Sequence, residues 1–187
     1  MNTIRPLLIL DLDETLIHAS EVPLDQTPDF VIAPYMLYRR PGVAVFLERM
    51  ARHYELAVWT SSSPAYARRV TDQLFDDPER LAFVWASDRC TPRRDLESDT
   101  WCQSKPLHKV GRRGYDLRRV LVVDDSPEKH TRNYGNLVRV RPFEGDPADD
   151  ELPLLASYLE QLAREPDFRR IEKRGWRRGG DGQAAGG

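Results

Sequence analysis

The chain has 187 residues, of which 28 are basic and 30 acidic, so its formal net charge at neutral pH is −2. This balance argues against a protein that a general positive field holds to nucleic acid or to an anionic membrane. Apolar residues make up 40% of the chain, as in ordinary globular proteins, but no apolar run approaches the roughly 20 residues that a membrane span needs. The N-terminus lacks a signal-peptide pattern, and we therefore expect a cytoplasmic protein.

Predicted strands and helices alternate along most of the chain. Strands are predicted where short apolar runs occur, in the segments 7–10, 55–60, 81–86, 118–127 and 136–143. Helices are predicted where apolar residues recur at helical spacing, in the segments 41–54, 61–75 and 149–163. Val43, Phe46 and Met50 share one face of the first helix, and Ser63 followed by Pro64 is typical of the start of the second.

This alternation predicts an α/β fold, with a Rossmann-like central parallel sheet flanked by helices. The prolines between Thr15 and Pro41 favour a loop with one hairpin at most. That segment is too short for a large cap domain, since domains usually exceed about 50 residues. Residues 86–104 are polar and irregular, and we interpret them as a small insertion. We expect one domain, residues 1–166, and a disordered tail, residues 167–187, which is basic and then glycine-rich.

Polar side chains follow three of the predicted strands, at the point where each strand ends. Asp11 and Asp13 follow the first strand, Thr60 ends the second, and the pair Asp124 and Asp125 ends the fourth. Because the carboxyl ends of parallel strands share one edge of the sheet, we expect these side chains to lie in one site. Several carboxylates without a cation would repel one another there and raise one another's pKa.

A hard divalent cation removes this repulsion, and oxygen-only ligands favour Mg²⁺ over zinc or copper. Mg²⁺ usually shares its coordination sphere with water and phosphate. The hydroxyl of Thr60 can donate to phosphate oxygens, and the ammonium of Lys109, which precedes the fourth strand, can neutralise them. Lys105 is the alternative to Lys109 for that role. The pattern therefore predicts a Mg²⁺-assisted site of phosphoryl transfer.

The acidic residues suggest separate roles. Asp11 lies at the end of its strand and can attack phosphorus to give an aspartyl-phosphate. Asp13 can protonate the leaving oxygen and then activate the water that hydrolyses the intermediate, while it offers Mg²⁺ its backbone carbonyl alone. Asp125, helped by Asp124, would complete the metal shell.

The ordered set DLDET, Thr60, Lys109 and DDSP resembles the four motifs of the haloacid dehalogenase superfamily of phosphatases. The segments LDLDETLIH, YRRPGVAVFLERM, ELAVWTSSS and DLRRVLVVDDSP are similar, more narrowly, to its CTD-type (FCP/SCP-like, NLI-interacting-factor-like) phosphatases. Those enzymes act on phosphoserine in the tail of RNA polymerase II and on other phosphoproteins. The resemblance covers about residues 6–164 and implies a Rossmann-like sheet. It also implies Asp11 as nucleophile, Asp13 as acid and base, Thr60 and Lys109 on the phosphate, and Asp11, Asp13 and Asp125 around Mg²⁺.

We therefore expect a Mg²⁺-dependent phosphatase that acts on a phosphorylated macromolecule, with a phosphoprotein as the leading choice, because an uncapped site suits a phosphate displayed on a large molecule such as a protein or a nucleic-acid end. A phosphatase for nucleic-acid ends is an alternative that differs in its substrate surface. A receiver-like phospho-acceptor switch, which is not an enzyme, is a second alternative. A receiver has its acid pair at the first strand and its acceptor later, whereas this chain has the reverse order, and Asp13 favours rapid hydrolysis. Residues 86–104 occupy the place of the family's small inserted sheet but scarcely resemble it, which leaves the substrate open.

Overall fold

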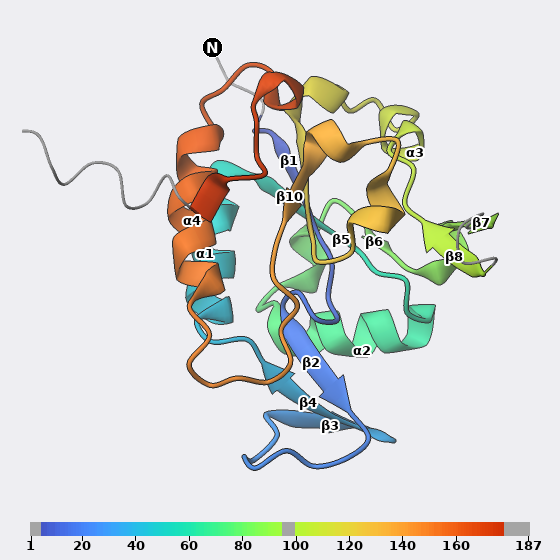
Figure 1. Cartoon of the computed structure of the whole chain (residues 1–187), viewed down its shortest axis with the longest axis vertical. Helices are drawn as coiled ribbons and strands as arrows, with labels where there is room; N and C mark the ends of the chain where they lie inside the picture. Colours follow the sequence, from blue (N-terminus) through green and yellow to red (C-terminus); the bar gives the residue numbers. More distant parts are fainter. Residues whose placement is uncertain (1–4, 95–99, 178–187) are drawn as a thin grey trace, which may run out of the picture.

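The computed structural model describes residues 5–94 and 100–177, which form a central five-stranded sheet covered by helices (Figure 1). The strand order is β10-β9-β1-β5-β6, and all neighbouring strands are parallel. The strands are β1 Leu7–Leu10, β5 Glu55–Trp59, β6 Val84–Trp85, β9 Val120–Asp124 and β10 Leu137–Arg139. The predicted parallel sheet is confirmed, although the edge strands β6 and β10 are shorter than predicted.

The predicted helices are also present. The α-helices of the described residues are α1 Val43–His53, α2 Pro64–Leu74, α3 His108–Gly111 and α4 Glu151–Leu162. Short 3₁₀ helices connect the other elements, namely η1 Pro78–Arg80, η2 Ser87–Arg89, η3 Leu117–Arg119, η4 Pro127–His130, η5 Tyr134–Asn136 and η6 Phe168–Arg170. Helix α2 begins as its sequence predicts, because the hydroxyl of Ser63 accepts a hydrogen bond from the amide of Tyr66 at 3.3 Å.

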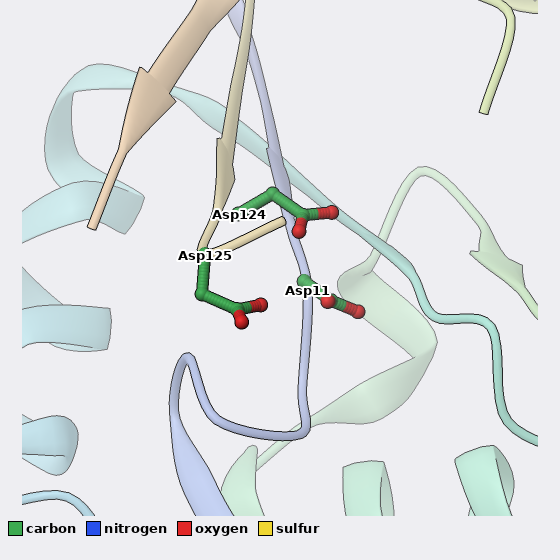
Figure 2. Close-up of side chains that lie close together, drawn as sticks. All are labelled: Asp11, Asp124 and Asp125. Atoms are coloured by element: carbon green, nitrogen blue, oxygen red, sulfur yellow. The ribbon is translucent and has the colours of Figure 1, made fainter. Parts of the chain in front are cut away.

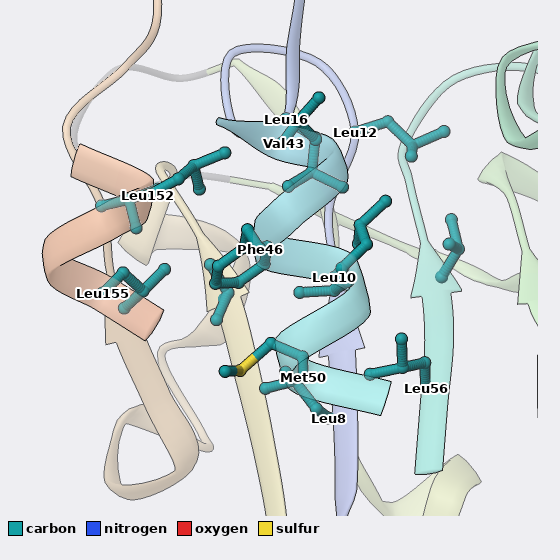
Figure 3. Packing of buried hydrophobic residues seen from close by; sticks show 14 of the residues in the cluster. Leu8, Leu10, Leu12, Leu16, Val43, Phe46, Met50, Leu56, Leu152 and Leu155 are labelled. Carbon is teal, nitrogen blue, oxygen red and sulfur yellow. The ribbon is translucent and has the colours of Figure 1, made fainter. Parts of the chain in front are cut away.

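Strand β1 is buried on both faces, and its side chains alternate between two apolar cores. Leu8 and Leu10 belong to the core that α1 and α4 cover, and these two helices lie side by side against the sheet (Figure 3). Leu7 and Ile9 belong to the core on the other face, which includes Val110 of α3. The central strand is therefore held from both sides, and the residues that follow it start from a rigid position.

The segment between β1 and α1 in the sequence forms a second, smaller sheet. It is antiparallel, has the order β2-β4-β3, and extends away from the main sheet (Figure 1). Its strands are β2 Ile17–Ser20, β3 Phe30–Ile32 and β4 Tyr35–Arg39. The sequence predicted one hairpin at most, but the prolines that suggested a loop, Pro23, Pro28 and Pro34, lie between the strands and do not interrupt them. The segment remains too small to be a globular cap, as expected.

The insertion at residues 86–104 is more regular than its sequence suggested. Residues on either side of the undescribed segment 95–99 pair as an antiparallel hairpin, β7 Thr91–Arg94 with β8 Trp101–Ser104. All four residues of β7 are exposed, so the strand has no apolar face to produce the alternation by which strands are recognised. The expectation of an irregular insertion is therefore wrong for these two strands.

Part of the expected tail packs on the domain. Phe168 in η6 is fully buried, and Trp176 has 5% of its surface exposed. The indole of Trp176 stacks on Tyr158 of α4, and its Nε1 donates a hydrogen bond of 2.8 Å to a backbone carbonyl at the end of β10. The structure thus corrects the expected tail for residues 167–177, because large aromatic side chains among the basic residues find a buried place. Residues 178–187 lie outside the described residues.

Replacing Trp176 by alanine should lower the free energy of unfolding by about 3 kcal/mol, because a buried indole loses its packing and leaves a cavity. Trp101 provides a matched control, since 73% of its surface is exposed. Trp101→Ala should change the free energy of unfolding by less than about 0.5 kcal/mol. Urea unfolding followed by circular dichroism measures both values. Equal, small losses in the two variants would show that residues 167–177 do not belong to the folded unit.

Glu151, at the start of α4, is a buried carboxylate held by two arginines. Arg141 donates to it from its amide at 2.8 Å and from Nε at 3.0 Å, and Arg177 donates from Nε at 2.9 Å. Burial alone would raise the pKa of Glu151, but the hydrogen bonds from Arg177 and Arg141 outweigh burial and hold the pKa below its usual value.

This lowered pKa should make the contribution of Glu151 to stability depend on pH. A carboxyl group of this kind stabilises the fold above its unfolded pKa, about 4.3 for glutamate, and the stabilisation is lost as the pH falls through the folded pKa. Glu151→Gln should therefore lower the urea midpoint at neutral pH, and the difference from wild type should narrow below about pH 4. Glu48→Gln is the control, because the Glu48 side chain is 68% exposed in a surface ion pair and its loss should matter little. A difference that stays constant with pH would contradict the lowered pKa.

Candidate active site

Strands β1 and β9 bring three carboxylates together at the carboxyl edge of the sheet (Figure 2). Leu10 of β1 lies beside Val123 of β9, so Asp11 and Asp124 follow from neighbouring positions. The amide of Asp11 donates a hydrogen bond to the carbonyl of Val123 at 3.0 Å. Asp11, Asp124 and Asp125 each place a side-chain oxygen within 4.8 Å of the others. The strand order thus assembles the acidic edge that the sequence predicted.

Lys105 lies within this acidic cluster. Its ammonium is 2.9 Å from Oδ1 of Asp11 and 2.5 Å from Oδ2 of Asp124, and its side chain is fully buried. Burial would lower the pKa of Lys105, but the charges of Asp11 and Asp124 raise the pKa above its ordinary value. The lysine therefore keeps its proton and neutralises part of the negative charge.

Lys109 does not reach the cluster, contrary to the prediction from sequence. It lies in α3, and its ammonium donates to the carbonyl oxygens of Arg89, at 2.7 Å, and Cys90, at 3.4 Å. The helix directs this side chain toward the insertion, whereas Lys105 precedes the helix and its amide donates to the carbonyl of Lys129 at 2.9 Å. Sequence separation from β9 could not distinguish the two lysines.

Asp124 is buried and surrounded by protein donors. Besides Lys105, Nε2 of His130 lies 2.9 Å from its Oδ2, and the amide of Ser126 donates to its Oδ1 at 2.9 Å. Burial alone would raise the pKa of Asp124, but the charge of Lys105 and the hydrogen bond with His130 hold it below its usual range. His130 was not predicted as a site residue, because its position depends on η4 folding back over the strand end. Asp124 therefore has fewer free oxygens than its two neighbours.

The cluster carries more negative charge than the neighbouring lysines neutralise. Burial and the charge of Asp124 raise the pKa of Asp11 to about 7, and the same two causes raise the pKa of Asp125. Burial and the charge of Asp13 raise the pKa of Glu14 to about 7. A divalent cation bound by Asp11 and Asp125 would remove this repulsion, and carboxylate oxygens are ligands that hard cations prefer. The residues present thus fit a hard divalent cation.

The side chain of Asp13 is held apart from the cluster. The loop turns at Glu14, which has a φ of 57°, and the Asp13 carboxylate then meets α2 and the loop before it. The hydroxyls of Ser62 and Tyr66 each donate to it at 2.6 Å, to Oδ2 and Oδ1 respectively. Thr60 Oγ1 lies 3.5 Å from Oδ2. Neither Ser62 nor Tyr66 was predicted as a site residue, because a run of serines before Pro64 is typical of a turn and Tyr66 has the helical spacing of a core residue.

A cleft of about 540 Å³ lies over Asp11 and Asp13. Thr60 and the three serines that follow it line the cleft, together with Ala19 and Tyr35 of the small sheet. This volume is in the range of ordinary ligand sites, about 300–1,000 Å³. The predicted residues Asp11, Asp13 and Thr60 therefore share one cavity, next to the acidic pair that follows β9.

A family model described as "NLI interacting factor-like phosphatase" matches residues 6–169. The chain belongs to this phosphatase family. The match covers the sheet, the acidic cluster and the cleft, and it confirms the resemblance that the motifs suggested. The order of motifs that separated the chain from a receiver-type switch is thus the order of a phosphatase family.

Two relatives are identical to this chain at about a third of the aligned positions. The chain is 33% identical over 167 residues to the human "Carboxy-terminal domain RNA polymerase II polypeptide A small phosphatase 1", an alignment that covers 86% of this chain and 60% of that protein. It is 30% identical over 188 residues to "CTD nuclear envelope phosphatase 1B" of Danio rerio, with 92% and 73% covered. The chain thus spans less than two thirds of the length of the human relative.

A solved structure with a similar fold confirms the fold class of this chain. The fission yeast RNA polymerase II CTD phosphatase Fcp1, bound to beryllium fluoride, superposes with a TM-score of 0.57 at 24% identity. The superposition covers 87% of this chain and 50% of the yeast chain. The fold is therefore the haloacid dehalogenase-type α/β fold that the sequence predicted.

The comparisons contradict the cytoplasmic location expected from the sequence. Relatives from Danio rerio and Xenopus laevis are named as nuclear envelope phosphatases. The expectation rested on the absence of targeting patterns, and such an absence does not specify a compartment. Among residues 5–94 and 100–177, no helix is long and apolar enough to cross a bilayer.

Proposed function

We propose that the chain is a Mg²⁺-dependent phosphatase that hydrolyses phosphomonoesters through an aspartyl-phosphate on Asp11, with phosphoserine and phosphothreonine of proteins as substrates. One observation carries the proposal. The carboxylate of Asp11 lies buried at the sheet edge, with its Oδ1 2.9 Å from the ammonium of Lys105 and a side-chain oxygen within 4.8 Å of those of Asp124 and Asp125. Membership of a phosphatase family supports the reaction class.

Asp11 is the proposed nucleophile. Its backbone is hydrogen-bonded to β9, and its Oδ1 is paired with Lys105, so Oδ2 is the oxygen that remains for attack from the cleft. The new bond joins this oxygen to phosphorus, and the bond between phosphorus and the substrate oxygen breaks. The leaving oxygen takes a proton and departs as an alcohol.

Asp13 is the proposed source of that proton, and it then takes a proton from the water that hydrolyses the aspartyl-phosphate. Ser62 and Tyr66 hold its carboxyl group in the cleft by the two hydrogen bonds of 2.6 Å. Burial and the charge of Asp13 raise the pKa of Tyr66, so the phenol keeps its proton and stays a donor. General acid–base catalysis of this kind contributes about 10²–10⁴-fold to rate.

Lys105, and not Lys109, is proposed to supply the fixed positive charge beside the nucleophile. Its buried ammonium is paired with Oδ1 of Asp11, so it orients the carboxylate and leaves Oδ2 free to attack, and its fixed charge stabilises the negative charge of the site during phosphoryl transfer. Thr60 is proposed to donate its hydroxyl to a phosphate oxygen, since it lines the cleft and its Oγ1 already accepts a hydrogen bond from the amide of Ser62 at 3.1 Å.

Asp11, Asp125 and the backbone carbonyl of Asp13 are proposed to hold Mg²⁺. Asp124 would complete the shell while its Oδ2 orients Lys105. When bound, the cation supplies positive charge that neutralises phosphoryl oxygens. The closeness of the carboxylate oxygens, within 4.8 Å of one another, supports this set.

A phosphorylated protein segment is the proposed substrate. The cleft is bordered by a small three-stranded sheet and not by a globular cap, which suits a phosphate displayed on a large molecule. The names of the human relatives, which refer to the carboxy-terminal domain of RNA polymerase II, support a protein substrate.

Hydrolysis of an aryl phosphate by the full chain, with and without Mg²⁺, tests the reaction. We expect turnover that disappears with a chelator and returns when Mg²⁺ is added back. Parallel assays with a phosphoserine peptide and a phosphorylated oligonucleotide test the substrate class, and we expect the higher kcat/KM with the peptide. Faster turnover of the oligonucleotide would overturn the protein substrate. A long-lived phosphoprotein after treatment with a small phosphodonor, without turnover, would instead indicate a receiver-type switch.

A further inference from the structure

A second lysine, Lys129, faces the reacting carboxylate from another side. Its ammonium lies 3.8 Å from Oδ2 of Asp11, whereas Lys105 is paired with Oδ1. The two lysines also differ in exposure, since the side chain of Lys129 is 22% exposed and that of Lys105 is fully buried. No predicted role involved Lys129, because the motif that precedes it in sequence ends at Pro127.

The backbone holds Lys129 in register with Lys105. Lys129 lies in η4, which begins at Pro127, and its amide donates to the carbonyl of Ser126 at 3.2 Å. Its own carbonyl accepts the hydrogen bond of 2.9 Å from the amide of Lys105. One backbone contact therefore ties the main chain at Lys129 to the main chain at Lys105, and the two side chains approach Asp11 from this shared backbone position.

The two lysines are placed for different tasks. Lys105 is enclosed between Asp11 and Asp124 and does not line the cleft, so its charge acts on the carboxylates. Lys129 does line the cleft, together with Asp11, Asp13 and Thr60. Among the described residues, the carboxylate nearest to the Lys129 ammonium is that of Asp11, at the long distance of 3.8 Å. The N–H donors of this ammonium are therefore available to a ligand.

We propose that Lys129 is a phosphate-binding residue in addition to Thr60. Its ammonium contacts the non-bridging oxygens of the substrate phosphate when the phosphate enters the cleft. This inference rests on the proposed function and deepens it by naming a residue that selects for a phosphate dianion. An ammonium beside a phosphate oxygen makes a charge-assisted hydrogen bond, which is about twice as strong as a neutral one. Lys129 therefore contributes to substrate affinity, whereas Lys105 balances the buried carboxylates.

Binding of inorganic phosphate to the Mg²⁺-loaded chain, measured by calorimetry, tests this assignment without turnover. Lys129→Gln should raise the Kd for phosphate, and the KM for an aryl phosphate, about 10-fold or more, as the loss of a charged hydrogen bond implies. Lys129→Arg keeps the charge and should recover part of the affinity. Arg132→Gln is the matched control, because it removes one positive charge from an exposed position in the same segment and should leave the Kd unchanged.

The alternative role for Lys129 is a counter-ion for Asp11 that never contacts substrate. In that case Lys129→Gln would tighten Mg²⁺ binding and leave the phosphate Kd equal to that of Arg132→Gln, and the proposal would be overturned. Thermal unfolding of each variant shows whether a loss of phosphate affinity comes from a loss of structure. If Lys129→Gln and Lys129→Arg both lose structure and affinity, that result also counts against the proposal. A wild-type chain that neither binds phosphate nor hydrolyses the ester would overturn the proposed function itself.

Discussion

Replacing Asp11 by asparagine should abolish turnover, with kcat for an aryl phosphate falling by at least about 10⁴-fold, as the loss of a nucleophile does in other enzymes. The neutral amide cannot form the bond to phosphorus. The fold should survive, because Asp124 still pairs with the buried Lys105 at 2.5 Å and the amide of residue 11 still bonds to β9. Circular dichroism and urea unfolding check that the variant is folded.

Asp13→Asn is the informative companion to Asp11→Asn. It retains the nucleophile but lacks the group that protonates the leaving oxygen and activates water. With an aryl phosphate, whose phenolate departs without a proton from the enzyme, an aspartyl-phosphate should therefore form, accumulate and be visible by mass spectrometry after a rapid acid quench. Asp11→Asn should show no such adduct. Turnover by Asp11→Asn within about 10-fold of wild type, or an adduct on another residue, would refute the role proposed for Asp11.

Lys105→Gln and Lys109→Gln should differ sharply, although they remove the same charge from residues close in sequence. Lys105→Gln should lower kcat/KM by about 10²–10³-fold, the usual effect of losing one preorganised charge that stabilises the transition state. It should also destabilise the fold by about 3–5 kcal/mol, because Asp11 and Asp124 would lose the buried ammonium that pairs with both of them. Lys109→Gln loses hydrogen bonds to two backbone carbonyls and should keep kcat/KM within about 3-fold of wild type.

The comparison remains decisive even if Lys105→Gln is too unstable to assay. Lys109→Gln removes no contact with the acidic cluster, so it should fold and turn over substrate. A loss of about 100-fold or more in Lys109→Gln, with its unfolding midpoint unchanged, would restore the assignment made from sequence and contradict the observed geometry. Added Mg²⁺ should partly restore the unfolding midpoint of Lys105→Gln, because a cation bound by Asp11 and Asp125 would replace some of the missing charge.

Local patterns were sufficient for the main sheet. The apolar run before Asp11 and the one before Asp124 are buried on both faces, and such runs are recognised without knowledge of the rest of the fold. The two peripheral sheets were missed for different reasons. Prolines concealed the three strands between residues 17 and 39, and full exposure concealed β7, so neither segment displayed the alternation that marks a half-buried strand.

The residues that contact the acidic side chains of the site from outside the predicted motifs could not be predicted from the sequence. Tyr66 has the spacing of a core residue, yet its hydroxyl reaches Asp13 because α2 starts directly beside the end of β5. His130 meets Asp124 because η4 folds back over the strand end. Each contact depends on the angle at which one element leaves another, and that angle is set by packing between residues far apart in the chain.

The sequence by itself determined that acids and a threonine would end neighbouring parallel strands and share one edge, since this follows from local apolar runs and from the direction of the strands. Tertiary structure alone decided which lysine joins them. Lys105 and Lys109 are equivalent in charge and nearly so in sequence position, but packing of α3 turns Lys109 toward the insertion and encloses Lys105 between two carboxylates. The choice between them is made by the burial of the surrounding chain, which no short pattern contains.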